Sequence, residues 1–249
     1  MPPSTGTATL VVGIDFGTTA GSPPGQPEIV SLWQTSIDNR QNNSDSHKVP
    51  SKIHYDDKGE VSWGFKVPAG VKAIEWFKLL LVSDKDLQSH LQGSSHIEVA
   101  SKSLDMLGKS FIEAVGDYLK ALWNHALEQI CNAEGQALID GMPFHVVLTV
   151  PAIWNDYSRA RMRVAAKCAG ILKLRAAGKT TLSLVSEPEA AAIATIPELE
   201  NREDLQVGDS FVVVDAGGGT VGIMVSNKPS TESQMTTRST SLLVRNVRQ

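Results

Sequence analysis

Short apolar runs alternate with amphipathic stretches along most of this chain, and that alternation predicts an α/β protein. Runs of β-branched residues that end at turn residues are typical of strands. A hairpin is expected between Val49 and Phe65, with its turn at Lys58-Gly59. The other predicted strands cover residues 10–15, 28–33, 145–150, 181–185, 211–215 and 221–226.

Apolar residues spaced three and four apart predict the helices. The longest such stripe indicates one helix from about Ser101 to Ala133, with Gly135 as its stop. Shorter helices are expected at residues 72–82, at a segment capped by Asp156 or Ser158 that ends at Gly170, and at residues 188–196, where Pro188 takes the first position.

The composition narrows the class of protein. Hydrophobic residues make up 41% of the 249 residues, which is enough for a buried core. The 23 basic and 27 acidic residues leave a net charge of -4, which argues against a general nucleic-acid binder. Two cysteines are too few for a disulfide framework. The sequence shows no signal peptide and no membrane-spanning run, so we expect a cytoplasmic protein without nucleic-acid or membrane partners.

One motif occurs twice, as VVGIDFGTTA around Asp15 and as FVVVDAGGGT around Asp215. Each is a strand, an aspartate and a glycine turn that closes on threonine. Such a turn exposes backbone N–H groups that can hold phosphate oxygens. A carboxylate beside that anion is reasonable if a divalent cation lies between them, or if the carboxylate orients a water. Each aspartate could instead begin an ordinary Asx-turn, but two copies indicate paired phosphate loops around one nucleotide.

Two other phosphate-loop motifs do not fit their surroundings. GGGTVG (217–222) matches the dinucleotide fingerprint, but a β-branched run and a proline follow it where a helix is required. AAGKTT (176–181) resembles the end of a P-loop. Lys173 stands where that loop needs its first glycine, and a strand follows. Both matches are therefore set aside.

With both loops, LTVPAIWNDYSRARMRVAAKCAGI and SLVSEPEAAAIA in this order, the chain resembles the actin-like ATPases. More narrowly, it is similar to the ATPase domain of the seventy-kilodalton heat-shock chaperones. WGFKVPAG and WFKLLL look closest to the divergent fungal and animal relatives of those chaperones. The resemblance implies the first lobe of an actin-like (ribonuclease H-like) α/β fold, with a mixed sheet, flanking helices, an inserted subdomain and the start of a second lobe.

The same resemblance implies a division of the chain. Residues 8–45 and 140–200 would form the core subdomain of the first lobe, and residues 46–139 the inserted subdomain. Residues 207–226 would be the first hairpin of the second lobe, less well packed than the strands at 145–185. The Ser/Thr-rich tail at 227–249 is expected to be disordered.

The resemblance also implies site residues. Lys78 falls where the family has a lysine that orients the attacking water and contacts the transferring phosphate; from the residues alone it could equally reach along a helix to solvent. Glu187 would act with Asp15 and Asp215 to hold Mg²⁺ through water, although a carboxylate at a helix N-terminus is favourable in itself. The two phosphate loops would comprise Asp15, Gly17, Thr18 and Thr19, and Asp215, Gly217, Gly218, Gly219 and Thr220.

Pro151 and Arg159 match positions that relay nucleotide state in the family. From the residues alone they are a strand-ending proline and a solvated helix residue. The chain also departs from the family pattern. Gly222 stands where a second acidic residue is usual, and AGSPPGQP (20–27) interrupts the strand expected after Thr19. The sequence ends soon after the second loop, where the family continues into its adenosine-binding lobe.

These features predict a chaperone-like protein that binds ATP or ADP with Mg²⁺ and couples hydrolysis to conformational change. A first lobe alone, truncated before the second, would be weakly active or inactive. Protein clients and co-chaperones are the expected partners. A non-catalytic interaction module or an incomplete gene product is the main alternative. A small-molecule kinase of the same fold is disfavoured by SEPEAAAIA.

Overall fold

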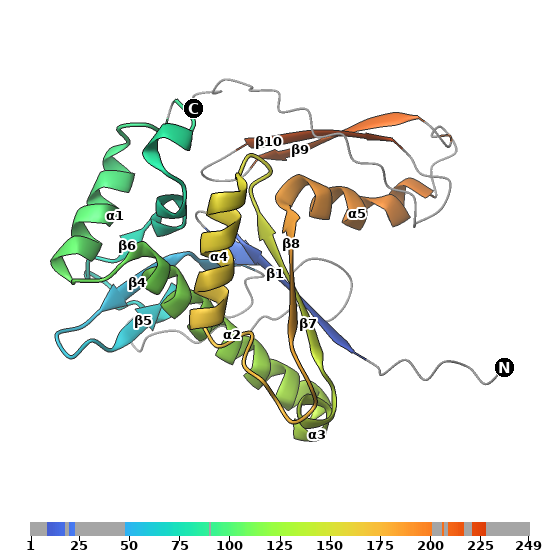
Figure 1. The fold of residues 1–249 in the computed structure, drawn as a ribbon, viewed down its shortest axis with the longest axis horizontal. Coiled ribbons are helices and arrows are strands. Elements are labelled where there is room, and N and C mark those ends of the chain that lie inside the picture. Colours follow the sequence, from blue (N-terminus) through green and yellow to red (C-terminus); the bar gives the residue numbers. More distant parts are fainter. Residues whose placement is uncertain are drawn as a thin grey trace.

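The computed structural model describes residues 9–17, 20–22, 48–89, 91–200, 206, 209–216 and 221–227. Strands dominate the described chain up to Glu75, consecutive helices follow from Ser95 to Gly141, and strands and helices alternate from Phe144 to Ala216 (Figure 1). The mixed α/β class expected from the sequence is confirmed. The strand expected at 28–33 and the tail at 228–249 lie outside the described residues.

A five-stranded sheet forms the centre of the fold, in the order β3-β2-β1-β7-β8. Its three long strands, β1 (Leu10–Phe16), β7 (Phe144–Val150) and β8 (Thr181–Ser186), are parallel. The short strands β2 (Ala20–Ser22) and β3 (Val49–Pro50) continue the sheet in antiparallel pairing. The expectation that AGSPPGQP (20–27) interrupts the strand after Thr19 is therefore wrong for its first three residues, because β2 pairs directly with β1 ahead of the prolines. Val146, Leu148 and Val150 of β7 are fully buried, which fits a central strand.

The long helix predicted at 101–133 is wrong as a single element. The chain forms α1 (Ser95–Met106) and α2 (Phe111–Glu134), separated by a turn at Gly108 with φ of 63°. Ser110 then begins α2 with a capping box, in which its hydroxyl accepts from Glu113 N and the Glu113 carboxylate accepts from Ser110 N. The predicted stop is confirmed, because Gly135 ends α2, and α3 (Gln136–Gly141) follows it.

Two shorter helix predictions also need correction. Residues 72–82 do not form one helix: β6 (Ile74–Glu75) pairs with β4 (Lys52–Tyr55), and the 3₁₀ helix η2 (Phe77–Leu81) follows. Helix α4 (Asp156–Cys168) is capped by Asn155, whose side chain accepts from Ser158 N. Asn155 caps in place of Asp156 or Ser158 because its extended backbone stands just outside the helix.

The predicted hairpin is confirmed as β4 and β5 (Val61–Trp63), which form a second sheet with β6. Its turn places Gly59 at φ of 79°, and the Asp56 carboxylate accepts from Lys58 N and Glu60 N. The 3₁₀ helix η1 (Gly64–Lys66) follows β5, and η3 (Asp84–Asp86) precedes α1.

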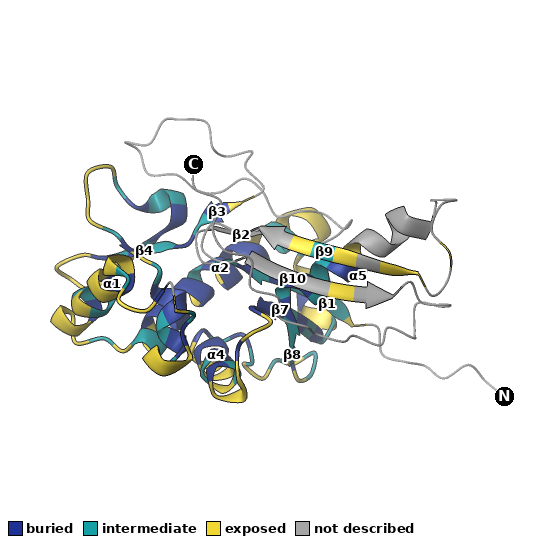
Figure 2. Cartoon of the chain, turned by 90° about the horizontal axis from the view of Figure 1, so that it is seen from above, coloured by how far each residue is buried: buried dark blue, intermediate teal, exposed yellow. Residues whose placement is uncertain are grey.

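Helix α5 (Glu187–Glu200) lies between the central sheet and a second hairpin, β9 (Ser210–Ala216) with β10 (Val221–Asn227), as Figure 1 shows. Val212 and Val214 are each 59% exposed. Figure 2 shows exposed stretches along β9, in contrast to the buried strand β7. For the described side chains, the prediction that these strands pack less well than those at 145–185 is confirmed, since β7 is mostly buried and β8 mostly half-buried.

An aromatic cluster joins α2 to the central sheet and to the sheet formed by β4, β5 and β6. The Tyr118 ring is fully buried and stacks on Phe16 of β1, with centroids 5.2 Å apart. It also lies 5.7 Å from the rings of Trp63 and Phe77. Its hydroxyl donates to Pro50 O at 3.2 Å.

Within the described ranges no helix is both long and apolar enough to cross a membrane.

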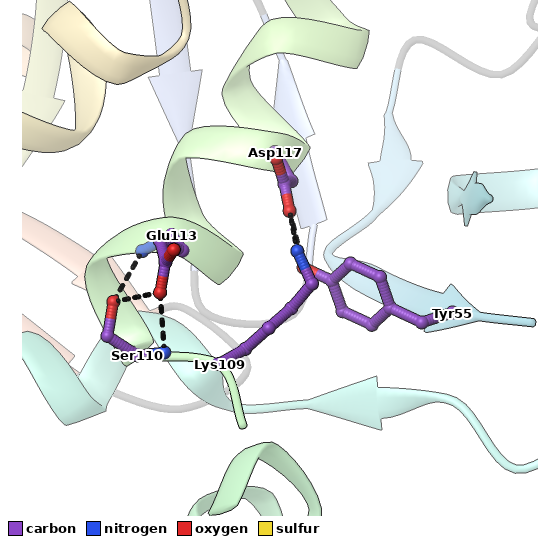
Figure 3. A network of polar contacts seen from close by, with 5 residues as sticks. All are labelled: Tyr55, Lys109, Ser110, Glu113 and Asp117. Carbon is purple, nitrogen blue, oxygen red and sulfur yellow. Dashed lines mark hydrogen bonds and ion pairs between the residues drawn. The ribbon is translucent and has the colours of Figure 1, made fainter. Parts of the chain in front are cut away.

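A polar cluster, drawn in Figure 3, fixes the start of α2 against β4. Asp117 accepts from the Tyr55 hydroxyl and from Lys109 Nζ, each at 2.9 Å. Lys109 Nζ also lies 4.4 Å from the centre of the Tyr55 ring. Burial, followed by the nearby Asp117 carboxylate, raises the pKa of Tyr55, and burial raises the pKa of Tyr118.

These two tyrosines predict alkaline instability. Because their pKa values are raised in the folded state, the protonated phenols stabilise it fully below the ordinary tyrosine pKa of about 10. Above that pH each tyrosine should lower the free energy of unfolding by about 1.4 kcal/mol per pH unit, until its folded pKa is reached. Urea unfolding of the wild type and of Tyr118→Phe between pH 8 and pH 11 tests this. The variant should show the shallower decline, and identical slopes would contradict the prediction.

Candidate functional site

The carboxyl ends of the three parallel strands meet at one edge of the central sheet. The register pairs Ile14 with Leu148 and Val150 with Ser186, so Asp15, Thr149 and Glu187 emerge close together. Thr149 Oγ1 donates to Asp15 Oδ1 at 2.6 Å. The carboxyl edge of parallel strands is where α/β proteins usually place ligands.

Lys78 reaches this edge from η2. Its side chain is 1% exposed, and Nζ donates to the Phe16 carbonyl and to Glu187 Oε1, the latter at 2.7 Å. Nζ also lies 5.3 Å from the centre of the Phe16 ring and 5.6 Å from that of Trp154. Such burial excludes the alternative that Lys78 reaches to solvent, and its amine faces the start of the first glycine loop.

The backbone before Lys78 explains how the side chain is aimed inward. Trp76 adopts a left-handed conformation with φ of 63°, which is rare for a bulky residue. Its ring stacks on His96 of α1, with centroids 5.2 Å apart. The chain therefore turns sharply after β6, and the 3₁₀ helix that follows buries Phe77, Leu79 and Leu81 together with Lys78.

Glu187 is the first residue of α5 and is 15% exposed. The helix N-terminus favours a carboxylate there, so that alternative and the site role are both compatible with its position. Buried ion pairs contribute little net stability, because desolvating both charges offsets their attraction. A fully buried lysine paired with a half-buried glutamate is therefore a candidate for a role beyond folding.

The first predicted loop is described in part. Gly17 O accepts from Ser51 Oγ at 2.9 Å, which ties the loop to the segment after β3. Thr18 and Thr19 lie outside the described residues. Sequence reasoning missed Ser51, Thr149 and Trp154. Thr149 could have been found from its place one residue before the end of a strand parallel to β1, whereas Ser51 carries no sequence signal.

The second predicted loop lies mostly outside the described residues. The backbone of Asp215 lies in β9, directly opposite Gly222 of β10. The Asp215 side chain and residues 217–220, which include Gly217, Gly218, Gly219 and Thr220, lie outside the described residues. The expectation that both loops face one nucleotide therefore stays a prediction. Among the described side chains, no three metal-ligating residues gather in one place.

Pro151 and Arg159 contact the same residue, Trp154. Pro151 O accepts from Trp154 N at 3.1 Å, and Arg159 Nε donates to Trp154 O at 3.2 Å. Arg159 is half-buried, so it is more than a solvated helix residue. Because the Trp154 ring lies near Lys78 Nζ, both residues are connected to the site. Their role as a relay stays a prediction.

Comparison with known proteins agrees with the sequence motifs. The family model described as "Hsp70 protein" matches residues 125–241. The chain is 30% identical over 231 residues to the chaperone protein HscA of Cronobacter sakazakii. It is 28% identical over 229 residues to an HscA homolog of Acinetobacter baumannii and 27% identical over 229 residues to one of Chromobacterium violaceum. In each case the match covers 87% of this chain and 32% of the relative.

Residues 125–241 match the Hsp70 family model and the relatives named above are HscA chaperones, which confirms the resemblance drawn from the motifs. The chain spans about a third of the length of the curated relatives that it matches. These relatives are bacterial, and they do not bear on the expected nearness to fungal and animal members.

Proposed function

We propose that this chain carries the phosphate and cation contacts of a Mg-ATP site in a chaperone-like ATPase. The observation that carries the proposal is the buried Lys78–Glu187 pair at the carboxyl edge of the sheet, beside Asp15. A cation, carboxylates and hydroxyls are the groups that bind a metal-bound phosphate. The match of residues 125–241 to the Hsp70 family model supports the same conclusion.

The residues present fit a magnesium ion. Asp15 is half-buried and Glu187 is 15% exposed, so both offer hard oxygen ligands near the surface of the site. When bound, Mg²⁺ neutralises negative charge on the phosphates during transfer to water. In this proposal Asp15 and Glu187 would hold the ion, with Asp215, through water. Lys78 would contact the transferring phosphate and orient the attacking water.

Binding by this chain is expected to be weak. Tight nucleotide binding requires the base and ribose to be buried, and hydrolysis requires groups fixed on both sides of the phosphate. The proposed site residues would contact the phosphates and the cation only, and not the base or the ribose. ATP hydrolysis, protein clients, co-chaperones and a cytoplasmic location are proposals for the whole protein.

Isothermal titration with Mg-ATP tests the proposed function. The wild type should bind with a dissociation constant on the order of 1 mM and release negligible phosphate. Asp15→Asn should weaken binding at least severalfold, because it removes a proposed cation ligand. The matched control is Asp57→Asn, at an exposed position in the β4–β5 turn. Micromolar affinity with measurable phosphate release, or no difference between the two variants, would overturn the proposal.

Gly222 provides a prediction about the cation. It lies opposite Asp215, so an aspartate there would share its strand face, and two like charges at opposite positions destabilise a sheet. In Gly222→Asp, Mg²⁺ should relieve that repulsion. Thermal unfolding with and without Mg²⁺ should therefore show a larger stabilisation of the variant than of the wild type. Equal stabilisation of both proteins would contradict the prediction.

A non-catalytic interaction module is the second candidate. The observation that favours it is the exposed face of the β9–β10 hairpin, where Val212 lies opposite Val225 and both are exposed. Under this alternative, Mg-ATP would not bind and the hairpin would be the functional surface. The relatives named above are chaperones, so a small-molecule kinase is not proposed.

A further inference from the structure

Arg161 of α4 lies at a junction of three elements. Its Nη1 donates to Leu81 O, the last residue of η2, at 2.9 Å. Its Nη2 donates to the Tyr157 hydroxyl at 2.7 Å. The guanidinium carbon lies 4.0 Å from the centre of the Tyr157 ring and 4.7 Å from that of Phe111, the first residue of α2. Stacking and hydrogen bonding together hold the guanidinium plane in one orientation.

The bond to Leu81 acts on the helix that carries Lys78. The last carbonyls of a helix have no partner within it, and a short 3₁₀ helix has poor hydrogen-bond geometry of its own. Arg161 supplies a charged donor to that end. Since a 3₁₀ helix has three residues per turn, Leu81 lies one turn after Lys78, on the same side of η2. Fixing the Leu81 carbonyl therefore restricts rotation of the turn that aims Lys78.

The same helix supports Lys78 from a second direction. Arg159 donates to Trp154 O, and the Trp154 ring lies 5.6 Å from Lys78 Nζ. Arg161 anchors the backbone of η2, whereas Arg159 anchors an aromatic neighbour of the amine. Because only the Arg161 contact involves η2 directly, it has the larger expected influence on the position of Lys78.

We propose that Arg161 is a positioning residue for Lys78, which it holds toward Phe16 and Glu187 by anchoring the Leu81 carbonyl. Its consequence for nucleotide binding rests on the proposed function above, but its effect on Lys78 does not. Loss of the anchor frees the last turn of η2, and Lys78 Nζ then visits solvent.

Amine acetylation measured by mass spectrometry, without nucleotide, tests the position of Lys78 directly. In Arg161→Gln, Lys78 should be acetylated roughly tenfold faster than in the wild type. The reason is that local opening of η2 exposes the amine, and in the variant this opening no longer has to break the charge-assisted bond from Arg161 to Leu81 O. The matched control is Arg163→Gln, which removes a similar arginine–carbonyl bond of α4, to Leu182 O at 3.1 Å. That variant should leave Lys78 protected, and exposed Lys58 should react equally in all the proteins.

Equal protection of Lys78 in folded Arg161→Gln and in the wild type would overturn the proposal, as would equal deprotection by Arg163→Gln. If Arg161→Gln does not fold, Tyr157→Phe decides the matter. It removes one bond to the guanidinium from a side chain that is 56% exposed, and it should raise Lys78 acetylation by a smaller factor. A titration with Mg-ATP is a separate arm: if the wild type does not bind, the proposed function fails while the acetylation result still stands.

Discussion

Lys78→Met is expected to lower the free energy of unfolding by about 3 kcal/mol, because it breaks a buried ion pair from one side. The variant leaves the Glu187 carboxylate, 15% exposed, and the Phe16 carbonyl without their lysine donor. For a chain of this length that loss corresponds to a fall in Tm of roughly 6–12 °C. Glu187→Gln should cost a similar amount, since it leaves the lysine buried without its carboxylate. Thermal and urea unfolding measure both effects.

The matched control is the exposed pair of Lys102 and Glu98, whose side chains are 73% and 58% exposed and whose charged atoms are 3.6 Å apart. Lys102→Met should change stability by less than about 0.5 kcal/mol. The double variant Lys78→Met/Glu187→Gln should be more stable than the sum of the two single losses predicts, because neither charge is left alone. Strict additivity, or a loss no larger than that of Lys102→Met, would show that the buried pair does not form.

Tyr118→Ala should cost about 3–5 kcal/mol of stability, because it removes a fully buried ring from the aromatic cluster. The ring touches Phe16, whose carbonyl binds Lys78, and Phe77, the neighbour of Lys78 in η2. The resulting cavity would therefore loosen the floor of the site as well as the core. Urea unfolding gives the stability, and Lys78 acetylation gives the local effect.

Tyr118→Phe serves as the control for the ring. It keeps the aromatic contacts and loses only the hydroxyl bond to Pro50 O, so it should cost about 1 kcal/mol near neutral pH. A similar loss in both variants would mean that the hydrogen bond, and not the packing of the ring, dominates at this position.

The three parallel strands of the central sheet could be predicted because their signals are local, whereas β2 and the place of β3 beside it were missed. The apolar runs ending at Asp15 and at Pro151 both became strands of the parallel sheet. The break between α1 and α2 was missed because the apolar stripe continues across it. The signals for the break were present in the sequence: Gly108 makes the turn, and the capping box of Ser110 and Glu113 begins a new helix although the apolar periodicity continues. The turn at Trp76 could not be predicted, because a left-handed backbone is unfavourable for tryptophan. The stacking of its ring on His96 is a tertiary contact that the local sequence pattern does not show.

The candidate site, like the fold, could be predicted only in part. The resemblance singled out Lys78 and Glu187, which lie 109 residues apart in sequence, and the structure brings them into contact. Two other residues that contact the first loop were not predicted. Thr149 is brought to Asp15 by the register of the parallel strands, and Ser51, 34 residues after Gly17, bonds to that residue's carbonyl. The predicted roles of Asp215 and of the second loop stay predictions, as these groups lie outside the described side chains.

The most direct test of the central claim compares three ligands in the presence of Mg²⁺: ATP, inorganic tripolyphosphate and adenosine. A site built from Asp15, Lys78 and Glu187 recognises phosphate and cation. Isothermal titration should therefore give ATP and tripolyphosphate affinities within about fivefold of each other, near the 1 mM scale, and no binding of adenosine. Lys78→Met/Glu187→Gln should abolish both interactions. Adenosine binding as tight as that of ATP, or undiminished ATP binding in the double variant, would contradict the account.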